Sequence, residues 1–297
     1  MPIAKANNMD IWYETFGNKE DEPLLLIMGA CCQGILWPTE FCQQLAAAGF
    51  FVIRYDHRDS GHSTCFDFEK KPYDLNDMVQ DAIGLLDFLA IKRFHIVGLS
   101  LGAVMGELIA VRYASRTLSL TLIATSSDFR PMNLAFAGFP QEENALSPPT
   151  TLYLAWMNKF LQALPKNEME LLEMRVEGWQ ILNGNKAPFE HKRYRELHRI
   201  FLQRASNLSV LANHIQVCKI SEELIRRLPA QVSVPTLILH GSEDPIFPPD
   251  HGRALASKIQ QAKFIAVEGM GHVPNIQFYE IMISNIKSFS RQTVLEA

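Results

Sequence analysis

Short, unbroken apolar runs alternate along the chain with stretches in which apolar residues recur every three or four positions. The runs lie at 24–28, 50–55, 94–97, 118–124, 236–240 and 263–267. Runs of this length are typical of strands buried on both faces, whereas the wider spacing is typical of helices with one apolar side. Strands that alternate with helices in this way predict βαβ units and a mostly parallel, twisted sheet flanked by helices, which is an α/β fold.

The regions before, between and after these runs add a hairpin and several helices. Residues 3–6 and 9–16 are joined by Asn7 and Asn8, which favours an antiparallel hairpin with a two-residue turn. Helices are expected at 39–49, at 74–90, directly after Ser100, from Asp250 and at 275–290.

The alternation stops near Phe129 and resumes near Pro235. Residues 131–149 contain Pro and Gly and predict irregular structure, and residues 150–228 are expected to be helical throughout. The sequence therefore predicts an α/β core formed by residues 1–130 and 229–297. Residues 131–228 are expected to form a helical cap inserted between the two halves of the sheet.

Ser100 lies between a buried strand and a helix, in the sequence Gly98-Leu99-Ser100-Leu101-Gly102. A strand that turns into a helix without a loop strains the backbone of the Ser, and the two glycines leave room for the turn. Such a turn exposes the hydroxyl beside the N-terminus of a helix, where free N–H groups stabilise a negative charge. The alternative is a Ser that only caps a core helix.

Asp244 and His272 each follow a predicted strand, and the chain order Ser, Asp, His is the one used by strand-turn-helix nucleophile folds. Parallel sheets gather functional groups at the carboxyl ends of their strands. A lone Asp here is usually a helix cap and a lone His among glycines a turn residue. Asp128, after an earlier strand, is the rival acid for orienting His272.

Five segments carry a resemblance to a known family, and the resemblance covers essentially the whole chain. They lie at 26–30, 52–63, 98–103, 244–246 and 269–272. The chain resembles α/β-hydrolases and, among them, the aclacinomycin methylesterase family, serine hydrolases that demethylate a bulky polyketide methyl ester. The resemblance implies Ser100 as nucleophile, His272 as general base and acid, and Asp244 as the group that orients His272.

The same resemblance implies an oxyanion hole formed by the backbone N–H groups of Leu101 and Ala30. Met28-Gly29 stands where many relatives have His-Gly, and Ala30 where the methylesterase has a second Gly. Because only a backbone N–H is needed, we expect the hole to be retained.

The pocket around these groups is expected to be apolar. Cys31 and Val273 neighbour the proposed oxyanion loop and His272, and Trp156 and Trp179 belong to the cap; all four are candidate substrate contacts. Most cap aromatics would simply pack its helices together. With no cluster of Arg or Lys aimed at the site, an uncharged, largely apolar ester is expected. The loop containing Arg58 and Asp59 is interpreted as a structural Arg–Asp network.

Composition narrows the possibilities. The 297 residues are 47% hydrophobic and 20% charged with a net charge of −4, which gives no indication of nucleic-acid or membrane binding. No apolar run reaches the roughly 18 residues of a membrane span, no secretory signal is visible, and five cysteines show no framework spacing. We expect a soluble cytoplasmic protein. No zinc spacing is recognisable among the histidines, so no metal and no cofactor are assigned.

The functional hypothesis is a serine hydrolase that cleaves a small carboxylic ester through an acyl-enzyme intermediate. Its partner would be a small-molecule ester, and the oligomeric state is left open. The alternatives are a cofactor-free perhydrolase, a carbon–carbon bond hydrolase and a ligand receptor without turnover. Val273-Pro274 counts against a carbon–carbon hydrolase, which often carries Trp after the catalytic His.

Overall fold

The computed structural model describes residues 2–162 and 165–295 of the chain. Residues 163 and 164 of the stretch expected to be helical, and residues 1, 296 and 297 of the expected core, lie outside the described residues.

One eight-stranded sheet forms the centre of the molecule. Its strands are β1 (Ile3–Ala6), β2 (Met9–Phe16), β3 (Glu22–Ile27), β4 (Phe50–Tyr55), β5 (Phe94–Leu99), β6 (Thr117–Ile123), β7 (Thr236–Gly241) and β8 (Lys263–Val267). They lie in the order β1-β2-β4-β3-β5-β6-β7-β8, and β3 to β8 are mutually parallel. β1 and β2 form the expected hairpin, with Asn7 and Asn8 both at positive φ as its two-residue turn requires. The predicted α/β fold is confirmed.

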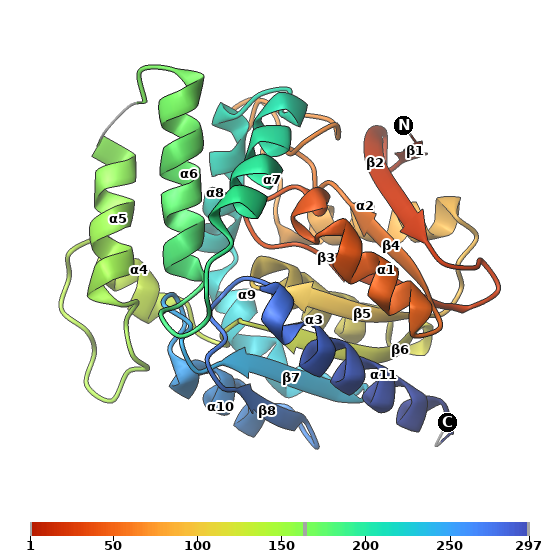
Figure 1. Ribbon diagram of the computed structural model, residues 1–297. Helices are drawn as coiled ribbons and strands as arrows, with labels where there is room; N and C mark the ends of the chain where they lie inside the picture. Colours follow the sequence, from red (N-terminus) through yellow and green to blue (C-terminus); the bar gives the residue numbers. More distant parts are fainter. Residues whose placement is uncertain (1, 163–164, 296–297) are drawn as a thin grey trace.

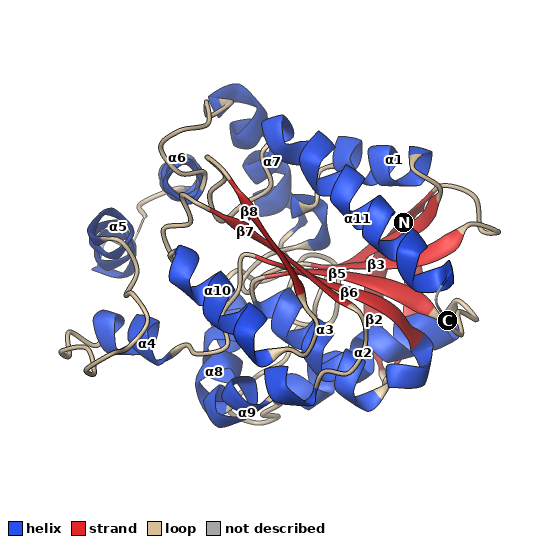
Figure 2. Cartoon of the chain, turned by 90° about the horizontal axis from the view of Figure 1, so that it is seen from below, coloured by secondary structure: helices blue, strands red, loops and turns tan. Residues whose placement is uncertain are grey.

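Two layers of helices cover the sheet (Figure 2). One face carries α1 (Thr39–Ala47) and α11 (Tyr279–Leu295); the other carries α2 (Leu75–Phe88), α3 (Leu101–Arg112) and α10 (Pro249–Lys258). α2 begins where the sequence indicates because the Asp74 side chain accepts from the backbone N–H of Asp77, while the Asp77 side chain accepts from that of Asp74. Within the described residues, no helix combines the length and apolarity needed to cross a membrane.

In the described part of the segment between β6 and β7, the structure has six α-helices. They are α4 (Arg130–Phe136), α5 (Thr151–Gln162), α6 (Glu168–Leu182), α7 (His191–Arg204), α8 (Asn213–Ile220) and α9 (Glu222–Arg227). Figure 1 shows α4, α5 and α6 on the side toward which the parallel strands point. α8 and α9 instead bury Val217 and Ile225 in the same apolar core as α2 and α3.

Two expectations for this segment are wrong in detail. α4 lies in the stretch expected to be irregular; Pro131 begins this helix rather than breaking it, because the first turn needs no N–H from that residue. The stretch from residue 150 is not helical throughout, since residues 183–190 connect α6 to α7 without a helix.

Buried polar contacts join the inserted helices to the core. Arg204 of α7 pairs with Asp56, which follows β4, at 2.7 Å, and its Nε donates to the Gln33 side chain at 3.1 Å. The loop after β4 is structural, as expected, but Arg58 pairs with Asp81 of α2 rather than with Asp59. Asp59 accepts hydrogen bonds from the Tyr73 hydroxyl and the Asn213 amide instead.

Candidate active site

Ser100 occupies the turn between β5 and α3 with φ +56° and ψ −119°. A positive φ is costly for a residue with a Cβ, so neighbouring groups must hold this backbone in place. The Ser100 N–H donates to the Ile123 carbonyl at 2.9 Å, and the Ser100 carbonyl accepts from the Thr125 hydroxyl at 3.1 Å. Contacts to β6 and to the residues after it therefore fix the turn.

The glycines beside Ser100 are required by close backbone approach. A Cβ on Gly98 would lie 2.3 Å from the Gly102 carbonyl oxygen, and one on Gly102 would lie 2.2 Å from the Ile27 carbonyl oxygen. Side chains at either position would push the helix away from the sheet. The strand, sharp turn and helix that the sequence predicts around Ser100 are confirmed.

Asp244 and His272 form a buried pair at the ends of β7 and β8. The Nδ1 of His272 lies 3.0 and 2.9 Å from the two carboxylate oxygens of Asp244. Oδ1 of Asp244 also accepts from the N–H groups of Ile246 and Phe247 at 2.9 and 3.0 Å. The backbone N–H of His272 donates to the Leu182 carbonyl at the end of α6, at 2.7 Å. The Asp244 carboxylate is therefore held by three groups, and His272 is held through both its ring and its backbone.

The electrostatics of this pair favour an ionised carboxylate. Burial by itself raises the pKa of Asp244, but the His272 ring and the hydrogen bonds it makes, with smaller contributions from His240 and the Phe247 N–H, bring that pKa below its ordinary value. A carboxylate at Nδ1 selects the neutral tautomer with its proton on Nδ1, which leaves Nε2 able to accept a proton. Among the described residues, no hydrogen bond joins the Ser100 hydroxyl to this ring in the present arrangement.

Asp128 has a different partner. Its carboxylate accepts from the Nε and Nη2 of Arg130 at 2.6 to 3.1 Å, and these bonds help to lower the pKa of Asp128, which burial opposes. The rival acid is therefore engaged at the start of α4, away from the His272 ring nitrogen that Asp244 binds.

The loop after β3 passes beside Ser100. A Cβ on Gly29 would lie 3.4 Å from the Ser100 Cβ. Within the described part of the chain, the N–H groups of Ala30 and Leu101 donate to no other protein group, whereas the Cys31 N–H donates to Nδ1 of His214 at 3.0 Å. The two expected oxyanion donors therefore have no protein partner among the described residues. His214 of α8 holds Cys31, the residue after Ala30.

The four candidate pocket residues differ in their surroundings. Cys31 donates from its thiol to the Leu211 carbonyl at 3.1 Å, and burial raises the pKa of that thiol, which disfavours the thiolate form that a nucleophilic Cys needs. Val273 is buried beside His272. Trp179 meets the His198 ring edge-on at 4.9 Å between the ring centres. Trp156 lies against Gly178 and stacks on Phe160, so it packs α5 onto α6.

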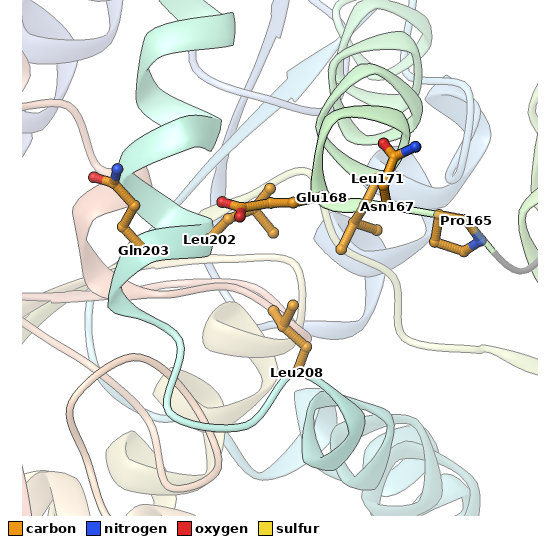
Figure 3. A pocket seen from close by; sticks show the side chains of 7 residues that line it. All are labelled: Pro165, Asn167, Glu168, Leu171, Leu202, Gln203 and Leu208. Carbon is orange, nitrogen blue, oxygen red and sulfur yellow. The ribbon is translucent and has the colours of Figure 1, made fainter.

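A surface hollow lies on the inserted helices (Figure 3). It measures about 550 Å³ and is lined by Pro165, Asn167, Glu168, Leu171, Leu202, Gln203 and Leu208. A second hollow of about 440 Å³ lies between α5, α6 and α7. Neither is lined by Ser100 or by any of the four candidate pocket residues.

Sequence reasoning missed Arg175 of α6. Its guanidinium carbon lies 3.8 Å from the centre of the Phe201 ring. Burial raises the pKa values of Cys31 and Cys32, and the Arg175 charge partly opposes that rise. A basic side chain therefore does approach the loop beside Ser100. The available signal was spacing: Arg175 precedes Trp179 by four residues on one helix, which places both on the same face.

Buried histidines near the site make hydrogen bonds to carbonyl groups of loops. Within the ranges that the structure describes, no three His, Cys, Asp or Glu side chains gather closely enough to hold an ion. His214 uses Nε2 toward the Arg58 carbonyl at 2.8 Å, and His57 uses Nε2 toward the Met28 carbonyl at 2.8 Å. These buried rings hold loops in place.

Comparisons with known proteins agree with this architecture. A family model described as alpha/beta hydrolase fold matches residues 22–279. The chain is 35% identical to rhodomycin D methylesterase of Streptomyces sp. strain C5, over 97% of both chains. It is also 35% identical to the rhodomycin D methylesterase of Streptomyces peucetius, over 98% of this chain and 99% of the relative.

Solved structures show the same fold at lower identity. An enol-lactonase from Burkholderia xenovorans LB400 superposes with a TM-score of 0.69 at 21% identity, over 97% of this chain and 99% of the enol-lactonase. A meta-cleavage product hydrolase from Pseudomonas fluorescens IP01 superposes with a TM-score of 0.72 at 18% identity, over 98% of each chain. The family match and the two full-length relatives place this chain in the α/β-hydrolase family.

Proposed function

We propose that this chain is a serine esterase that hydrolyses the methyl or short-alkyl ester of a bulky hydrophobic or aromatic acid. The observation that carries the proposal is the Asp244–His272 pair, held at the same end of the sheet as the strained Ser100. Full-length similarity to two rhodomycin D methylesterases supports the choice of a methyl ester.

The reaction begins with attack of the Ser100 hydroxyl on the ester carbonyl carbon. Nε2 of His272 takes the hydroxyl proton as the oxygen attacks, and Asp244 stabilises the resulting imidazolium through Nδ1. The ester carbonyl oxygen becomes an oxyanion, which the N–H groups of Ala30 and Leu101 stabilise at the N-terminus of α3.

Collapse of this tetrahedral intermediate breaks the ester bond. His272 returns its proton to the departing alkoxide, so that methanol leaves from a methyl ester and an acyl group remains on Ser100. Water then attacks the acyl carbon as His272 takes one of its protons. Collapse of this second tetrahedral intermediate breaks the bond to Ser100 Oγ, His272 returns the proton to that oxygen, and the carboxylic acid is released.

Residues 131–228 act as a cap that selects the acyl half of the substrate in this proposal. The Leu182 carbonyl of α6 holds the His272 N–H, and the Gln33 side chain, in the loop beside Ser100, donates to the Phe201 carbonyl of α7 at 2.8 Å. These contacts join α6 and α7 to both sides of the site. Substitutions in α6 and α7 should therefore change acyl preference without altering the chemistry.

The test is a substrate panel with methanol and acid quantified as products. We expect methyl esters of aromatic acids to give a higher kcat/KM than long-chain triacylglycerols or peptide amides. A higher kcat/KM on amides or emulsified lipid contradicts the proposal. A burst of one acyl group per chain without turnover would identify a receptor, and peroxide-dependent or carbon–carbon cleavage activity above ester hydrolysis would identify the remaining alternatives.

A further inference from the structure

Four buried polar atoms without partners lie together between α6 and α7. They are Nε of Arg175, Nε1 of Trp179, and both ring nitrogens of His198. Thirteen such atoms occur among the described side chains, so nearly a third of them belong to these three neighbouring residues. Buried polar atoms are normally hydrogen-bonded, because leaving one unpaired costs the desolvation of that group. A cluster of them offers several buried donors and acceptors to the polar group of a ligand.

The three side chains are held in place by aromatic contacts. The His198 ring meets Trp179 at 4.9 Å and Phe201 at 6.1 Å between ring centres, and the Arg175 guanidinium lies on the Phe201 ring at 3.8 Å. A guanidinium stacked by its face keeps its N–H donors along its edge, where they remain available to a planar acceptor. Stacking therefore orients Arg175 without satisfying it.

Arg175 also has no acidic partner among the described residues, since no ion pair or hydrogen bond joins it to a carboxylate. Other arginines of the inserted helices do pair: Arg195 lies 2.7 Å from Glu173, and Arg204 2.7 Å from Asp56. Burial lowers the pKa of Arg175, as it does for a cation whose solvation is not replaced by a counter-charge.

The cluster lies between the two loops of the candidate active site. On α7, the Tyr194 hydroxyl donates to the Pro274 carbonyl, two residues after His272, and the Phe201 carbonyl accepts from Gln33 beside the Ala30 loop. Tyr194, His198 and Phe201 recur every three or four residues and so share one face of α7. His198 is thus midway along a helical face, about 10 Å long, that reaches from one loop to the other.

α6 gives the same placement independently. Arg175, Trp179 and Leu182 are spaced i, i+4, i+7, so the face that carries the two unpaired donors ends at the carbonyl that binds the His272 N–H. On both helices, the cluster therefore shares a face with residues that contact the loops beside Ser100 and His272.

We propose that Arg175, Trp179 and His198 form a recognition site for an anionic oxygen group, a carboxylate or an ionised phenol, on the acyl half of the substrate. The inference rests on the proposed esterase activity and refines it: the acid is hydrophobic and aromatic, but it also carries a negative charge. The guanidinium edge and the indole N–H donate to the oxygens of that group. Neutral His198 contributes one further donor and one acceptor, which suits a hydroxyl beside the anion.

The experiment compares matched methyl esters with and without a second anionic group. The carboxylate probes are the monomethyl esters of terephthalic and naphthalene-2,6-dicarboxylic acid, which offer two lengths. Methyl 4-methylbenzoate and methyl 2-naphthoate are their neutral counterparts. Methyl 4-hydroxybenzoate, compared with methyl 4-methylbenzoate at pH 7 and pH 9.5, separates an ionised phenol from a carboxylate. We expect the wild type to favour at least one anionic probe by about tenfold or more in kcat/KM.

Arg175→Met should reduce the ratio of kcat/KM between the anionic and the neutral ester to about one, by lowering kcat/KM on the anionic ester. Trp179→Phe, which keeps an aromatic ring at this position and removes the indole N–H donor, should reduce the preference by a few-fold and serves if the first variant does not fold. Arg195→Met removes an exposed arginine of α7 and should leave the preference unchanged. Equal rates on all pairs in the wild type, or a preference that survives Arg175→Met, would overturn the inference.

Binding of the product dianion separates this inference from the esterase proposal. Terephthalate and naphthalene-2,6-dicarboxylate are titrated into Ser100→Ala and into Ser100→Ala with Arg175→Met. Binding of either to the first variant that is lost in the second supports the recognition site even if no ester is hydrolysed. Hydrolysis of neutral esters together with no difference in dianion binding leaves the esterase standing and removes the recognition site.

Discussion

The polar groups at the strand ends and those between α6 and α7 differ in how completely the protein satisfies them. At the strand ends, Asp244 accepts hydrogen bonds from His272 and from two backbone N–H groups, and the Ser100 backbone is tied to β6 and Thr125. Between the two helices, Arg175, Trp179 and His198 have buried atoms without partners. The groups proposed for chemistry are therefore held in place by protein hydrogen bonds, whereas the groups proposed for recognition have donors and acceptors available to a ligand.

The largest expected effect comes from removing the nucleophile at the strand ends. Ser100→Ala should lower kcat on an activated aromatic ester by about 10⁵–10⁶-fold, because neither His272 nor the oxyanion donors replace an attacking oxygen. Steady-state kinetics with active-site titration measure the loss. Ser257→Ala, at an exposed position of α10, is the matched control and should keep full activity.

The next effect concerns the choice of acid. Asp244→Asn should lower kcat by about 10⁴-fold, because an amide at this position no longer selects the tautomer with its proton on Nδ1. Asp128→Asn should retain nearly full activity, since Asp128 is paired with Arg130. The reverse result, an inactive Asp128→Asn and an active Asp244→Asn, would show that the acid has been misassigned.

The attachment of the inserted helices gives a stability effect. Arg204→Met leaves the buried Asp56 carboxylate without its cation and should lower the free energy of unfolding by about 3–5 kcal/mol. Arg199→Met breaks an exposed pair with Glu196 and should cost no more than about 1 kcal/mol. Urea unfolding measures both. Similar values for the two variants would show that the Arg204 contact does not join the helices to the core.

The smallest effect, measured per pH unit, is a change in the pH dependence of stability that comes from His198 in the recognition cluster. Burial and the Arg175 charge lower the pKa of His198 to about 2, far below its value in the unfolded chain. Between about pH 6.5 and about pH 2, the unfolded state therefore binds a proton that the folded state does not. The free energy of unfolding consequently decreases as the pH is lowered through this range. His198→Phe should reduce the slope of the free energy of unfolding against pH in this range by up to about 1.4 kcal/mol per pH unit. Parallel curves for the wild type and the variant would contradict a neutral, buried His198.

Local patterns predicted the strand ends well. Apolar runs marked β3 to β7 because both faces of these strands are covered, whereas β8, at the edge of the sheet, is only partly buried. Short motifs identified Ser100, Asp244 and His272 as candidates, and the structure places each of them after a strand. Strand limits were within about two residues, and Asp74 identified the start of α2. The α4 helix was missed because Pro131 is equally compatible with a loop and with a first helical turn.

The recognition cluster was less accessible to sequence reasoning because it depends on contacts between distant segments. Arg175 and His198 each occur in a charged helix, where an exposed side chain is the ordinary expectation. Only the packing of α6 on α7 brings the guanidinium onto Phe201. The same holds for Arg58, whose partner Asp81 lies on another element, while the adjacent Asp59 serves Tyr73.

Covalent labelling tests the central claim, that Ser100 is the nucleophile and that His272 activates it, most directly. The protein is treated with a fluorophosphonate ester, and the labelled peptide is identified by mass spectrometry in the wild type, His272→Ala and Ser100→Ala. The account predicts one adduct on Ser100 in the wild type, far slower labelling in His272→Ala, and no labelling in Ser100→Ala. An adduct on another residue that abolishes ester hydrolysis, or full labelling of Ser100 in His272→Ala, would contradict it.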